Sequence, residues 1–347
     1  MVDYNNIDLS ICIPVYNGEN TIETAINSAL CISGCSFEIL ISDNCSEDNT
    51  KKIINHFTKI NKGVVIGHFN KENLGFARNF KKCIELARGK YIFFIGADDY
   101  LMAKNINLLV EYLNKNNNVS IVTSNFVLFK KDYNEITRKA IYLNNKEKRF
   151  SKGEDALVNW LFYATLGSIG GYLFRKVAII SVLSKIPDET IVPQMYLGGI
   201  LATNYDVAHV PFFTFAQRLS DDTTQLANRQ YQSLDVVHDI FDLIHSISMK
   251  VNNKFLERTL VRQHCSGIIN NIISYRVFGS FTVFIKLQKI ILMENGLIRS
   301  ILNIKYIAFV FASILIPKEV LKKLLQYFRN SKEGCFKKLL ELIIAKE

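Results

Sequence analysis

Four short apolar runs recur through the first hundred residues at intervals of about 27 residues, and polar side chains follow each of them. The runs are Leu9–Pro14, Phe37–Ser42, Val64–Phe69 and Tyr91–Ile95. An interval of this length holds one strand and one crossover helix, so the spacing predicts βα units and a mostly parallel sheet. Because the runs are apolar nearly throughout, we expect helices on both faces of that sheet.

The segments between these runs have helical periodicity. Apolar residues fall on one helical face in two places, at Ile22, Ala25, Ile26, Ala29 and Leu30, and at Phe76, Phe80, Cys83, Ile84 and Ala87. Further along, the patterns predict a strand, a polar loop, a helix and a turn with a strand, over Val119–Phe129, Tyr133–Arg149, Ser151–Phe162 and Ser168–Phe174. Amphipathic helices are then predicted over Leu234–Val251, Phe255–Tyr275 and Phe281–Met293. We therefore predict an α/β domain over residues 1–225 and a helical region over residues 226–347.

The net positive charge of the chain comes entirely from its C-terminal part. Residues 1–250 contain 26 basic and 26 acidic residues, whereas residues 251–347 contain 16 basic and 6 acidic ones, which accounts for the net charge of +10. The same region is rich in Ile, Leu and Phe, which favours an anionic membrane surface over nucleic acid as the partner.

The most apolar window of the C-terminal region is too short to span a bilayer. Ile307–Ile316 has about half of the roughly 20 residues that a membrane-spanning helix needs. Lys318–Phe328 and Phe336–Ile344 are basic and amphipathic. The sequence therefore predicts a helical tail that lies on the membrane, with a helical subdomain packed on the core as the alternative.

The composition, 49% hydrophobic and 21% charged with five prolines, is that of a folded protein and excludes a disordered chain. The seven cysteines are scattered, and no secretory pattern precedes the first apolar run. We expect free thiols and a cytoplasmic location, peripheral on the inner face of the cell membrane.

The polar residues after the four runs point to a ligand site. No G-x-G-x-x-G follows the first run and no G-x-x-x-x-G-K-[ST] occurs, which disfavours a dinucleotide-binding fold and a P-loop enzyme. Parallel sheets bind ligands at the carboxyl ends of their strands. The polar groups that follow the four runs are Pro14-Val15-Tyr16-Asn17, Asp43-Asn44-Cys45-Ser46-Glu47-Asp48, Asn73-Leu74-Gly75 with Arg78, and Gly96-Ala97-Asp98-Asp99.

This order of motifs resembles the family 2 glycosyltransferases of the GT-A fold, over roughly residues 7–225. The resemblance implies an inverting enzyme that moves a sugar from a nucleotide-diphosphate sugar to a hydroxyl of a glycan or lipid-linked glycan. It further implies bacterial surface-polysaccharide synthesis, such as O-antigen or capsule, and is strongest toward abequosyltransferase-like enzymes. A UDP-sugar is the favoured donor, with CDP- and dTDP-sugars as alternatives.

Besides Asp98, the resemblance assigns nucleotide-binding roles to six residues in the first half, which are Pro14, Tyr16, Glu19, Asp43, Asn73 and Arg78. Pro14 and Tyr16 match the family's P-x-Y element beside the base, and Asp43 matches the acid that accepts a hydrogen bond from it; an Asx turn is the alternative for Asp43. Glu19 contacts the nucleotide or caps a helix. Arg78, one turn into the helix after Asn73, is expected to meet phosphate or base, with an exposed surface arginine as the alternative.

Asp98 and Asp99 are predicted to hold Mg²⁺ or Mn²⁺. Two carboxylates at the end of an apolar strand are costly to bury without a cation, and a divalent ion would bridge them to a diphosphate. The alternative is a turn or helix cap before Leu101–Val110. Gly96 departs from the family, in which many members have an acid there and read D-x-D, so one carboxylate is missing.

The second half matches the family less closely. Phe174-Arg175-Lys176 resembles the family's segment before the catalytic base, yet the alignment places Pro193-Gln194 where the base belongs, and glutamine accepts no proton. We therefore predict Asp188 and Glu189 as candidate catalytic bases, with a loop turn as the alternative. Arg218 resembles the family's phosphate clamp, although Ser220 replaces a common histidine.

Two other functions remain open at this point. A nucleotide-binding scaffold without turnover is suggested by Gly96, Gln194 and Ser220, which all depart from the family. A nucleotidyltransferase ranks last, because Pro14–Gly18 does not supply a glycine-rich phosphate loop.

Overall fold

The computed structural model describes residues 7–130, 133–140, 145–159, 168–219, 233–296, 300 and 303–329. The chain divides into two compact units, residues 1–221 with 246–252, and residues 222–245 with 253–347. The predicted domain boundary after residue 225 lies within residues 220–232, outside the described part of the chain.

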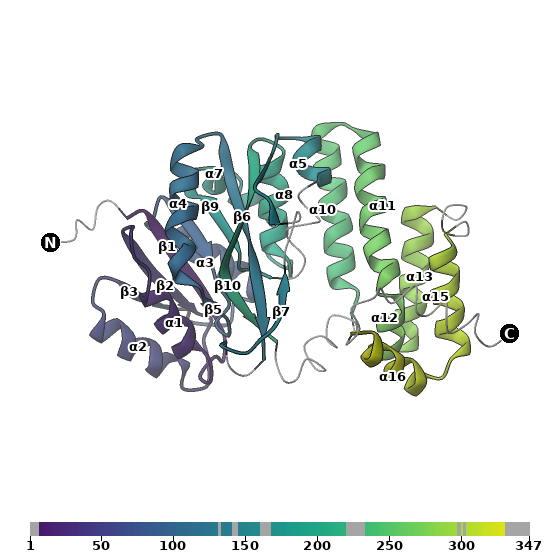
Figure 1. The fold of residues 1–347 in the computed structure, drawn as a ribbon, viewed down its shortest axis with the longest axis horizontal. Helices are drawn as coiled ribbons and strands as arrows, with labels where there is room; N and C mark the ends of the chain where they lie inside the picture. Colours follow the sequence, from purple (N-terminus) through teal and green to yellow (C-terminus); the bar gives the residue numbers. More distant parts are fainter. Residues whose placement is uncertain are drawn as a thin grey trace. The chain divides into compact units, whose positions relative to one another are not determined.

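The first unit is built on a sheet of 10 strands among the described residues (Figure 1). The hydrogen-bonded order is β3-β2-β1-β4-β9-β6-β10-β5, with β7 paired to β6 and β8 paired to β10. The strands are β1 (Leu9–Val15), β2 (Phe37–Asp43), β3 (Val65–Phe69), β4 (Tyr91–Phe94), β5 (Tyr100–Leu101), β6 (Val119–Phe129), β7 (Ile136–Ala140), β8 (Lys148–Phe150), β9 (Tyr172–Arg175) and β10 (Asp206–Arg218).

The four predicted strands form the parallel half of this sheet. β1 pairs in parallel with β2 and β4, and β2 pairs in parallel with β3. β9 runs antiparallel between β4 and β6, so β6 and its parallel neighbour β10 point the same way as β1–β4. The carboxyl ends of all six parallel strands therefore lie along one edge, which the sequence predicted for the four runs that became β1–β4.

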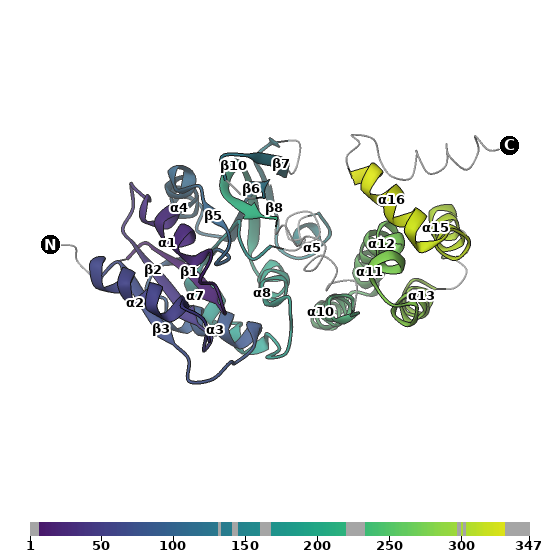
Figure 2. The ribbon, with the colours of Figure 1, turned by 90° about the horizontal axis from the view of Figure 1, so that it is seen from below.

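Helices cover both faces of the sheet, which confirms the α/β prediction. The apolar residues of β1 that alternate along one face pack with α1, α2 and α4. On the other face α3 lies against β1 and β2, and Phe80 of α3 stacks on Phe94 of β4 at 4.0 Å between ring centroids. Figure 2 shows α1 and α4 on one side of the sheet and α3 and α8 on the other. The helices are α1 (Ile22–Leu30), α2 (Thr50–Ile60), α3 (Phe76–Leu86), α4 (Ile106–Lys115), α5 (Glu154–Asn159), α7 (Lys176–Ile180) and α8 (Pro193–Ala202), with short 3₁₀ turns at Ala103–Asn105 and Leu183–Lys185.

The prediction of a plain loop over Tyr133–Arg149 is wrong. Residues of this segment form β7, which pairs with β6, and most of β8, which pairs with β10. The described side chains of both strands are mostly exposed, so no apolar alternation marks them in the sequence. Pairing here comes from the backbone, because the long strands β6 and β10 offer ladder hydrogen bonds to any extended partner.

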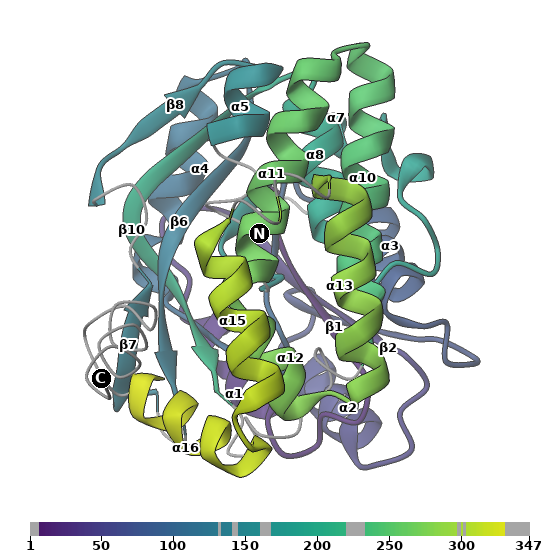
Figure 3. The ribbon, with the colours of Figure 1, turned by 90° about the vertical axis from the view of Figure 1, so that its right-hand side faces the viewer.

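The second unit is helical, as predicted, and α15 and α16 both contact α12 (Figure 3). The predicted helix over Phe255–Tyr275 is two helices, because the first one ends at Asn270. No helix among the described residues has both the length and the apolar character needed to cross a membrane. The predicted segment Phe336–Ile344 lies outside the described residues. The helices are α10 (Asp235–Val251, shared between the units), α11 (Lys254–Asn270), α12 (Ile272–Phe278), α13 (Phe281–Asn295), α15 (Ile304–Leu315) and α16 (Lys318–Arg329).

The Phe-Arg-Lys segment has a structural role at the amino edge of the parallel strands. Arg175 donates from Nη2 to the carbonyls of Leu113 (2.8 Å) and Asn116 (3.1 Å), at the C-terminus of α4, and from Nε to the carbonyl of Val119 (3.2 Å). Lys176 donates from Nζ to the carbonyl of Ala87. These contacts tie α3, α4 and β6 together at the edge opposite the predicted ligand site.

We predict that Arg175→Ala lowers the free energy of unfolding by about 1–3 kcal/mol, because three carbonyls lose a charged donor. Urea denaturation of the full chain measures this loss. Arg175→Lys is the control: it keeps the charge but not the planar fork, so it should recover only part of the stability. A loss too small to detect in Arg175→Ala would contradict the structural role.

Candidate active site

The loops after β1 and β2 are joined by hydrogen bonds from three consecutive residues. Each of these residues donates its backbone N–H to a side chain that precedes or begins α2. The bonds run from Asn17 to Ser46 Oγ (2.9 Å), from Gly18 to Thr50 Oγ1 (2.8 Å) and from Glu19 to Asp48 Oδ2 (3.0 Å). Glu47 donates its backbone N–H to Asn17 Oδ1 at 2.9 Å, and Asn17 has a φ of 52°. We call these two loops, which hydrogen bonds join in both directions, the double loop.

Two predicted nucleotide-binding acids are already engaged within this double loop. The Glu19 carboxylate accepts from the backbone N–H (3.0 Å) and Nδ2 (2.8 Å) of Asn49, so it holds the start of α2 and does not cap α1. Asp43 is 1% exposed, and its Oδ1 accepts from the hydroxyl (2.5 Å) and backbone N–H (3.3 Å) of Ser46. Both bonds come from a residue three positions on, whereas the Asx turn that the sequence left open for Asp43 would join the side chain to the N–H two positions on.

A cavity of about 310 Å³ opens at the ends of β1 and β2 and the start of α3. It brings together three predicted residues, Pro14, Tyr16 and Asn73, while Asp43 and Glu19 are not among its lining residues. Tyr16 is 46% exposed and Phe76 is 38% exposed, so the cavity has two partly open aromatic walls. The lining residues are Pro14, Val15, Tyr16, Asn44, Asn73, Gly75, Phe76 and Asn79.

A network of asparagine side chains forms the inner wall of this cavity, and sequence reasoning missed it. Asn44 donates from Nδ2 to Asn73 Oδ1 at 2.7 Å and accepts on Oδ1 from Asn70 Nδ2 at 3.2 Å. Asn70 also donates to Asn79 Oδ1 at 2.9 Å, and Asn44 and Asn79 are both buried. The recurrence of asparagine on both sides of Gly75, whose φ of 79° forms the turn into α3, is the signal that was available.

The candidate bases lie in the loop before α8, and a cation holds one of them. Lys81 Nζ of α3 contacts Asp188 Oδ1 at 2.5 Å, and this bond, with the charges of Lys81 and Arg78, lowers the pKa of Asp188. Glu189 is exposed and forms no ion pair within the described residues. Arg78 is the third residue of α3 and is exposed. Its guanidinium forms no hydrogen bond with the described part of the chain.

Asp98 and Asp99 converge above Gly96 at the end of β4. A Cβ built on Gly96 would lie 2.8 Å from Asp99 Oδ2 and 2.9 Å from Asp98 Oδ1. Both carboxylates therefore approach one point that only glycine leaves free. The same loop lies against the loop that follows β1, since a Cβ on Gly18 would lie 3.7 Å from the Cβ of Ala97.

The electrostatics of this pair favour an added positive charge. Burial, followed by the charge of Asp98, raises the pKa of Asp99 to about 8. Desolvation also raises the pKa of Asp98. Asp98 is more exposed than Asp99, which is 4% exposed, so the charge of Asp99 is the one that most needs a compensating cation. Two converging carboxylate oxygens are the hard ligands that Mg²⁺ and Mn²⁺ prefer, so the residues fit such an ion.

The described residues contain no group of three or more His, Cys, Asp or Glu side chains that could hold a metal.

Arg218, at the end of β10, lies beside the aspartate pair, as its predicted role requires. Its backbone N–H donates to Asp99 Oδ1 (2.9 Å) and its Nε donates to the carbonyl of Asp98 (2.9 Å). The guanidinium also stacks on Phe129, 4.7 Å from the ring centroid. In this structure Arg218 therefore fixes the loop that holds the carboxylates. Ser220 lies outside the described residues.

Gln194 stands in the first turn of α8, at the position that the sequence aligned with the family's base. Its side chain is 5% exposed, and Oε1 has no hydrogen-bond partner among the residues that the structure describes. Burying an amide oxygen without a hydrogen-bond donor costs folding free energy, so packing alone does not explain why residue 194 is a glutamine.

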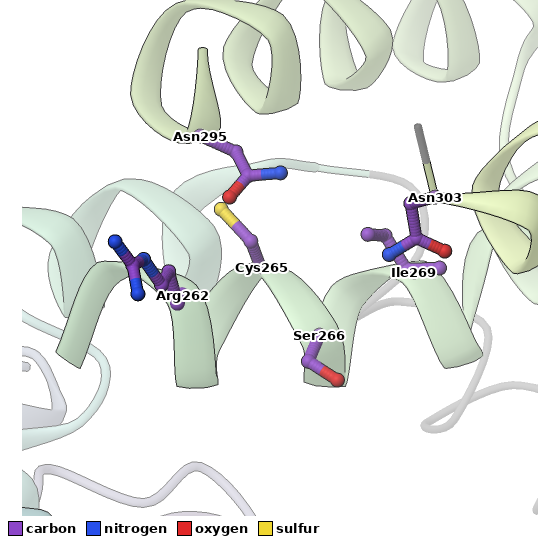
Figure 4. Close-up of a pocket in the computed structure, with 6 residues that line it drawn as sticks. All are labelled: Arg262, Cys265, Ser266, Ile269, Asn295 and Asn303. Carbon is purple, nitrogen blue, oxygen red and sulfur yellow. The ribbon is translucent and has the colours of Figure 1, made fainter. Parts of the chain in front are cut away.

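The helical unit has a cavity of its own, of about 310 Å³, that the sequence did not predict (Figure 4). Cys265 points from α11 toward Asn295, at the end of α13, and Asn303 closes the cavity before α15. The lining residues are Arg262, Cys265, Ser266, Ile269, Asn295 and Asn303.

Beside it, a cavity of about 130 Å³ contains His245 between two glutamates. His245 Nδ1 is 2.8 Å from Glu257 Oε1 and Nε2 is 3.3 Å from Glu294 Oε2, with Arg258 and Arg262 on the same cavity wall. Desolvation lowers the pKa of His245, but the two glutamates outweigh it and raise the pKa above its usual value.

We predict that the helical unit is stabilised by protonated His245. Because the folded-state pKa is raised, the contribution is complete below the unfolded-state pKa of about 6.5 and is lost as the pH rises through the folded-state pKa. The group is more than one-third exposed, so the contribution should be about 1 kcal/mol or less. Melting temperatures across this range should fall more for the wild type than for His245→Gln; parallel curves would contradict the prediction.

Comparisons with known proteins agree with the geometry. The model of glycosyl transferase family 2 matches residues 10–180. Abequosyltransferase RfbV of Salmonella typhimurium is 36% identical over 107 residues, which are 30% of this chain and 32% of that protein. The putative teichuronic acid biosynthesis glycosyltransferase TuaG of Bacillus subtilis is 30% identical over 105 residues, 30% of this chain and 41% of that protein. The match thus spans less than half of either relative.

Solved structures share the fold at low sequence identity. A fragment of S. aureus TarS in complex with UDP aligns with a TM-score of 0.58 and 13% identity, covering 88% of this chain and 91% of that one. The mannosyltransferase PcManGT of Pyrobaculum calidifontis, in complex with GDP-Man and Mn²⁺, aligns with a TM-score of 0.53 and 14% identity, covering 89% and 86%. The resemblance read from the sequence is therefore confirmed: over residues 10–180 this chain carries a domain of glycosyl transferase family 2, with the GT-A fold.

Proposed function

We propose that this protein transfers a sugar from a nucleotide-diphosphate sugar to a hydroxyl of a glycan or lipid-linked glycan, with inversion, in bacterial surface-polysaccharide synthesis such as O-antigen or capsule. The observation that carries this proposal is the convergence of Asp98 and Asp99 over Gly96, at the same carboxyl edge of the sheet as the cavity lined by Tyr16 and Asn73. The family match and the relatives RfbV and TuaG support the same reaction class.

The donor base is proposed to lie in the cavity between Tyr16 and Phe76. Its volume of about 310 Å³ is at the lower end of the range for small-ligand sites. The amide groups of Asn44 and Asn73, held by their network, offer directional contacts to a base or ribose. Ser46 occupies Oδ1 of Asp43 and leaves Oδ2 to accept from a ring N–H, and because Asp43 does not line this cavity, that bond requires the base to reach past the lining residues to the end of β2. A UDP-sugar is the favoured donor, in keeping with the UDP bound in the TarS structure, and CDP- and dTDP-sugars are alternatives.

The diphosphate is proposed to lie against Asp98 and Asp99 through Mg²⁺ or Mn²⁺. When bound, such an ion neutralises the charge that develops on the leaving diphosphate. Arg78, in the first turn of α3, adds a cation to the positive end of that helix. Arg218 holds the aspartate loop in place and presents its guanidinium beside the same carboxylates.

The acceptor hydroxyl needs a base. Its oxygen attacks the anomeric carbon, the bond from that carbon to the diphosphate oxygen breaks, and the hydroxyl proton passes to a carboxylate. Between the two proposed bases, Glu189 is the better one, because Lys81 lowers the pKa of Asp188 and so weakens it as a proton acceptor.

We predict that Glu189→Gln reduces kcat by about 100-fold or more, as expected for loss of a general base, with little effect on KM for the donor. Asp188→Asn is the matched control, since it removes a neighbouring carboxylate held by Lys81, and it should cost about tenfold or less. Steady-state transfer assays measure both. Equal, small effects would remove this loop from the chemistry.

A direct experiment tests the function as a whole. A thermal-shift screen of nucleoside diphosphates with Mn²⁺ identifies the base, and the best nucleotide's sugars are then assayed for hydrolysis and for transfer to lipid-linked glycans. The proposal expects one base to raise the melting temperature and a product of inverted configuration. No stabilisation by any nucleotide, or a retained configuration, would contradict it.

One observation favours a second function, a nucleotide-binding scaffold without turnover. Gln194 is buried at the position aligned with the family's base and accepts no proton. This alternative expects the same thermal shift with Mn²⁺ but no donor hydrolysis and no transfer to any acceptor, so the same pair of experiments separates the two.

We also propose that the protein works in the cytoplasm, peripheral on the inner face of the cell membrane, where lipid-linked acceptors are found. Its support is the basic, apolar composition of residues 251–347.

A further inference from the structure

Three large apolar side chains are exposed on one face of α15. Phe311 is 59% exposed, Ile314 is 58% exposed and Leu315 is 73% exposed. Positions three and four apart lie on the same side of a helix, so the three form one patch at the C-terminal end of α15. The opposite side of the helix already faces the unit's interior, because Tyr306, Phe309 and Ala312 are buried. The exposed patch is therefore not needed for packing within the described unit.

Lysines follow this apolar patch directly. Ile316 and Pro317 separate α15 from α16, and the two helices meet at a corner there (Figure 3). Lys318, Lys322 and Lys323 of α16 are exposed, and none of them has an ion-pair partner among the described residues. Leu321 is buried and anchors this end of α16, which packs on α12. Apolar side chains and uncompensated cations thus share one corner.

We propose that this corner docks on an anionic lipid bilayer, with Phe311, Ile314 and Leu315 entering the interface and the three lysines binding lipid phosphates. An apolar face flanked by lysines is the pattern of helices that lie in a membrane interface. α15 has 12 residues and is about 18 Å long, short of the roughly 30 Å of a hydrocarbon core, so it cannot span it.

A second copy of this chain is a poorer occupant of the same surface. A symmetric dimer through this corner would place the patch against itself and would bring the three lysines of both copies together with a single glutamate from each α16 to oppose them. Glu319 is the one acidic residue in α16. The proposal concerns where the protein sits and does not depend on which sugar it transfers.

The test is flotation of the full-length protein with vesicles of phosphatidylcholine alone or mixed with phosphatidylglycerol. We expect binding to the mixed vesicles, release by high salt, and little binding to phosphatidylcholine. The variant Lys318→Glu/Lys322→Glu/Lys323→Glu should lose about 100-fold or more in partition coefficient, at about fivefold for each lysine removed. Phe311→Ser/Ile314→Ser/Leu315→Ser should lose at least about tenfold.

Matched controls lie elsewhere on the surface. Phe255→Ser removes an aromatic ring that is 67% exposed, and Lys59→Glu/Lys62→Glu removes two exposed lysines of the first unit. These variants should bind vesicles like the wild type, and all variants should keep the wild-type melting temperature and donor hydrolysis.

Equal binding to both vesicle types, or equal losses in the controls, would overturn the proposal. Analytical ultracentrifugation without lipid tests whether a second copy of the chain occupies the patch instead. A dimer that dissociates only in Phe311→Ser/Ile314→Ser/Leu315→Ser would show that it does. Because vesicle binding is read without enzymatic activity, its failure would count against this surface and against the proposed membrane location but would leave the proposed sugar transfer standing, and loss of activity leaves the membrane proposal standing.

Discussion

Asp99→Asn is expected to reduce kcat/KM by about 100- to 1000-fold, the effect of removing a charged group that stabilises the departing diphosphate. The substitution is nearly isosteric, and the amide oxygen of the new side chain would still accept from the backbone N–H of Arg218, so the loop should keep its conformation. Because a buried carboxylate is replaced by a neutral group, the metal-free protein should be no less stable than the wild type. Steady-state kinetics with Mn²⁺ and a thermal melt measure the two effects.

Two further variants delimit this prediction. Asp98→Asn should cause a loss of similar size, since its carboxylate converges on the same point. Asp235→Asn makes the same chemical change at an exposed position at the start of α10 and should leave the kinetics unchanged. If Asp99→Asn kept more than about a tenth of the wild-type activity, the aspartate pair would not hold the leaving group.

Gly96→Asp, which would create the D-x-D pattern common in the family, is expected to impair the enzyme. A Cβ at this position lies under 3 Å from oxygens of both Asp98 and Asp99, so the carboxylates must turn away from their point of convergence. A third negative charge in the same space adds repulsion. Since a misplacement of about 1 Å can cost about 100-fold in rate, we expect a loss of at least that size in kcat/KM.

Gly96→Ala separates crowding from charge. The crowded atoms are the ends of two side chains, which can rotate, so the fold and melting temperature should change little, while activity falls by about 10- to 100-fold. Wild-type activity in Gly96→Ala, or a gain of activity in Gly96→Asp, would show that the carboxylates are not poised as described.

The parallel half of the sheet was predictable because its signal is local. The runs that became β1, β2 and β4 are buried on both faces, so burial itself makes them apolar, whereas β3, at the edge of the sheet, is only partly buried. β7 and β8 carry no such signal, since their described side chains are mostly exposed and partner strands far along the chain pair with their backbones.

The asparagine network of the cavity could not be predicted from the sequence, because its members come together only in the fold. In a sequence, Asn44 and Asn79 read as ordinary loop and helix-start residues, and only the fold brings them to Asn70 and buries them. Arg175 was assigned to the acceptor half by resemblance, yet its three carbonyl partners belong to α4, its C-terminal cap and the first residue of β6, which the linear pattern does not connect to it.

The placement of the predicted site residues shows what a motif does and does not specify. Asp98, Asp99 and Arg218 are 120 positions apart at most, and the structure joins them as expected, because their strands end at the same edge. Asp43 and Glu19 are not among the cavity's lining residues: Asp43 is bonded within its own loop, and Glu19 is bonded to Asn49 at the start of α2. The position of a residue at the end of a strand predicts which edge of the sheet it lies at. Its hydrogen-bond partners come from other loops, and the sequence around the residue does not identify them.

Isothermal titration calorimetry tests the central claim most directly, with the nucleoside diphosphate that stabilises the protein best titrated in the presence and absence of Mn²⁺. For the wild type, the affinity should rise at least about tenfold when Mn²⁺ is added, and for the double variant Asp98→Asn/Asp99→Asn this gain should vanish while the metal-independent affinity persists. An affinity gain from Mn²⁺ that survives in the double variant, or no gain in the wild type, would contradict a metal-bridged diphosphate at the end of β4.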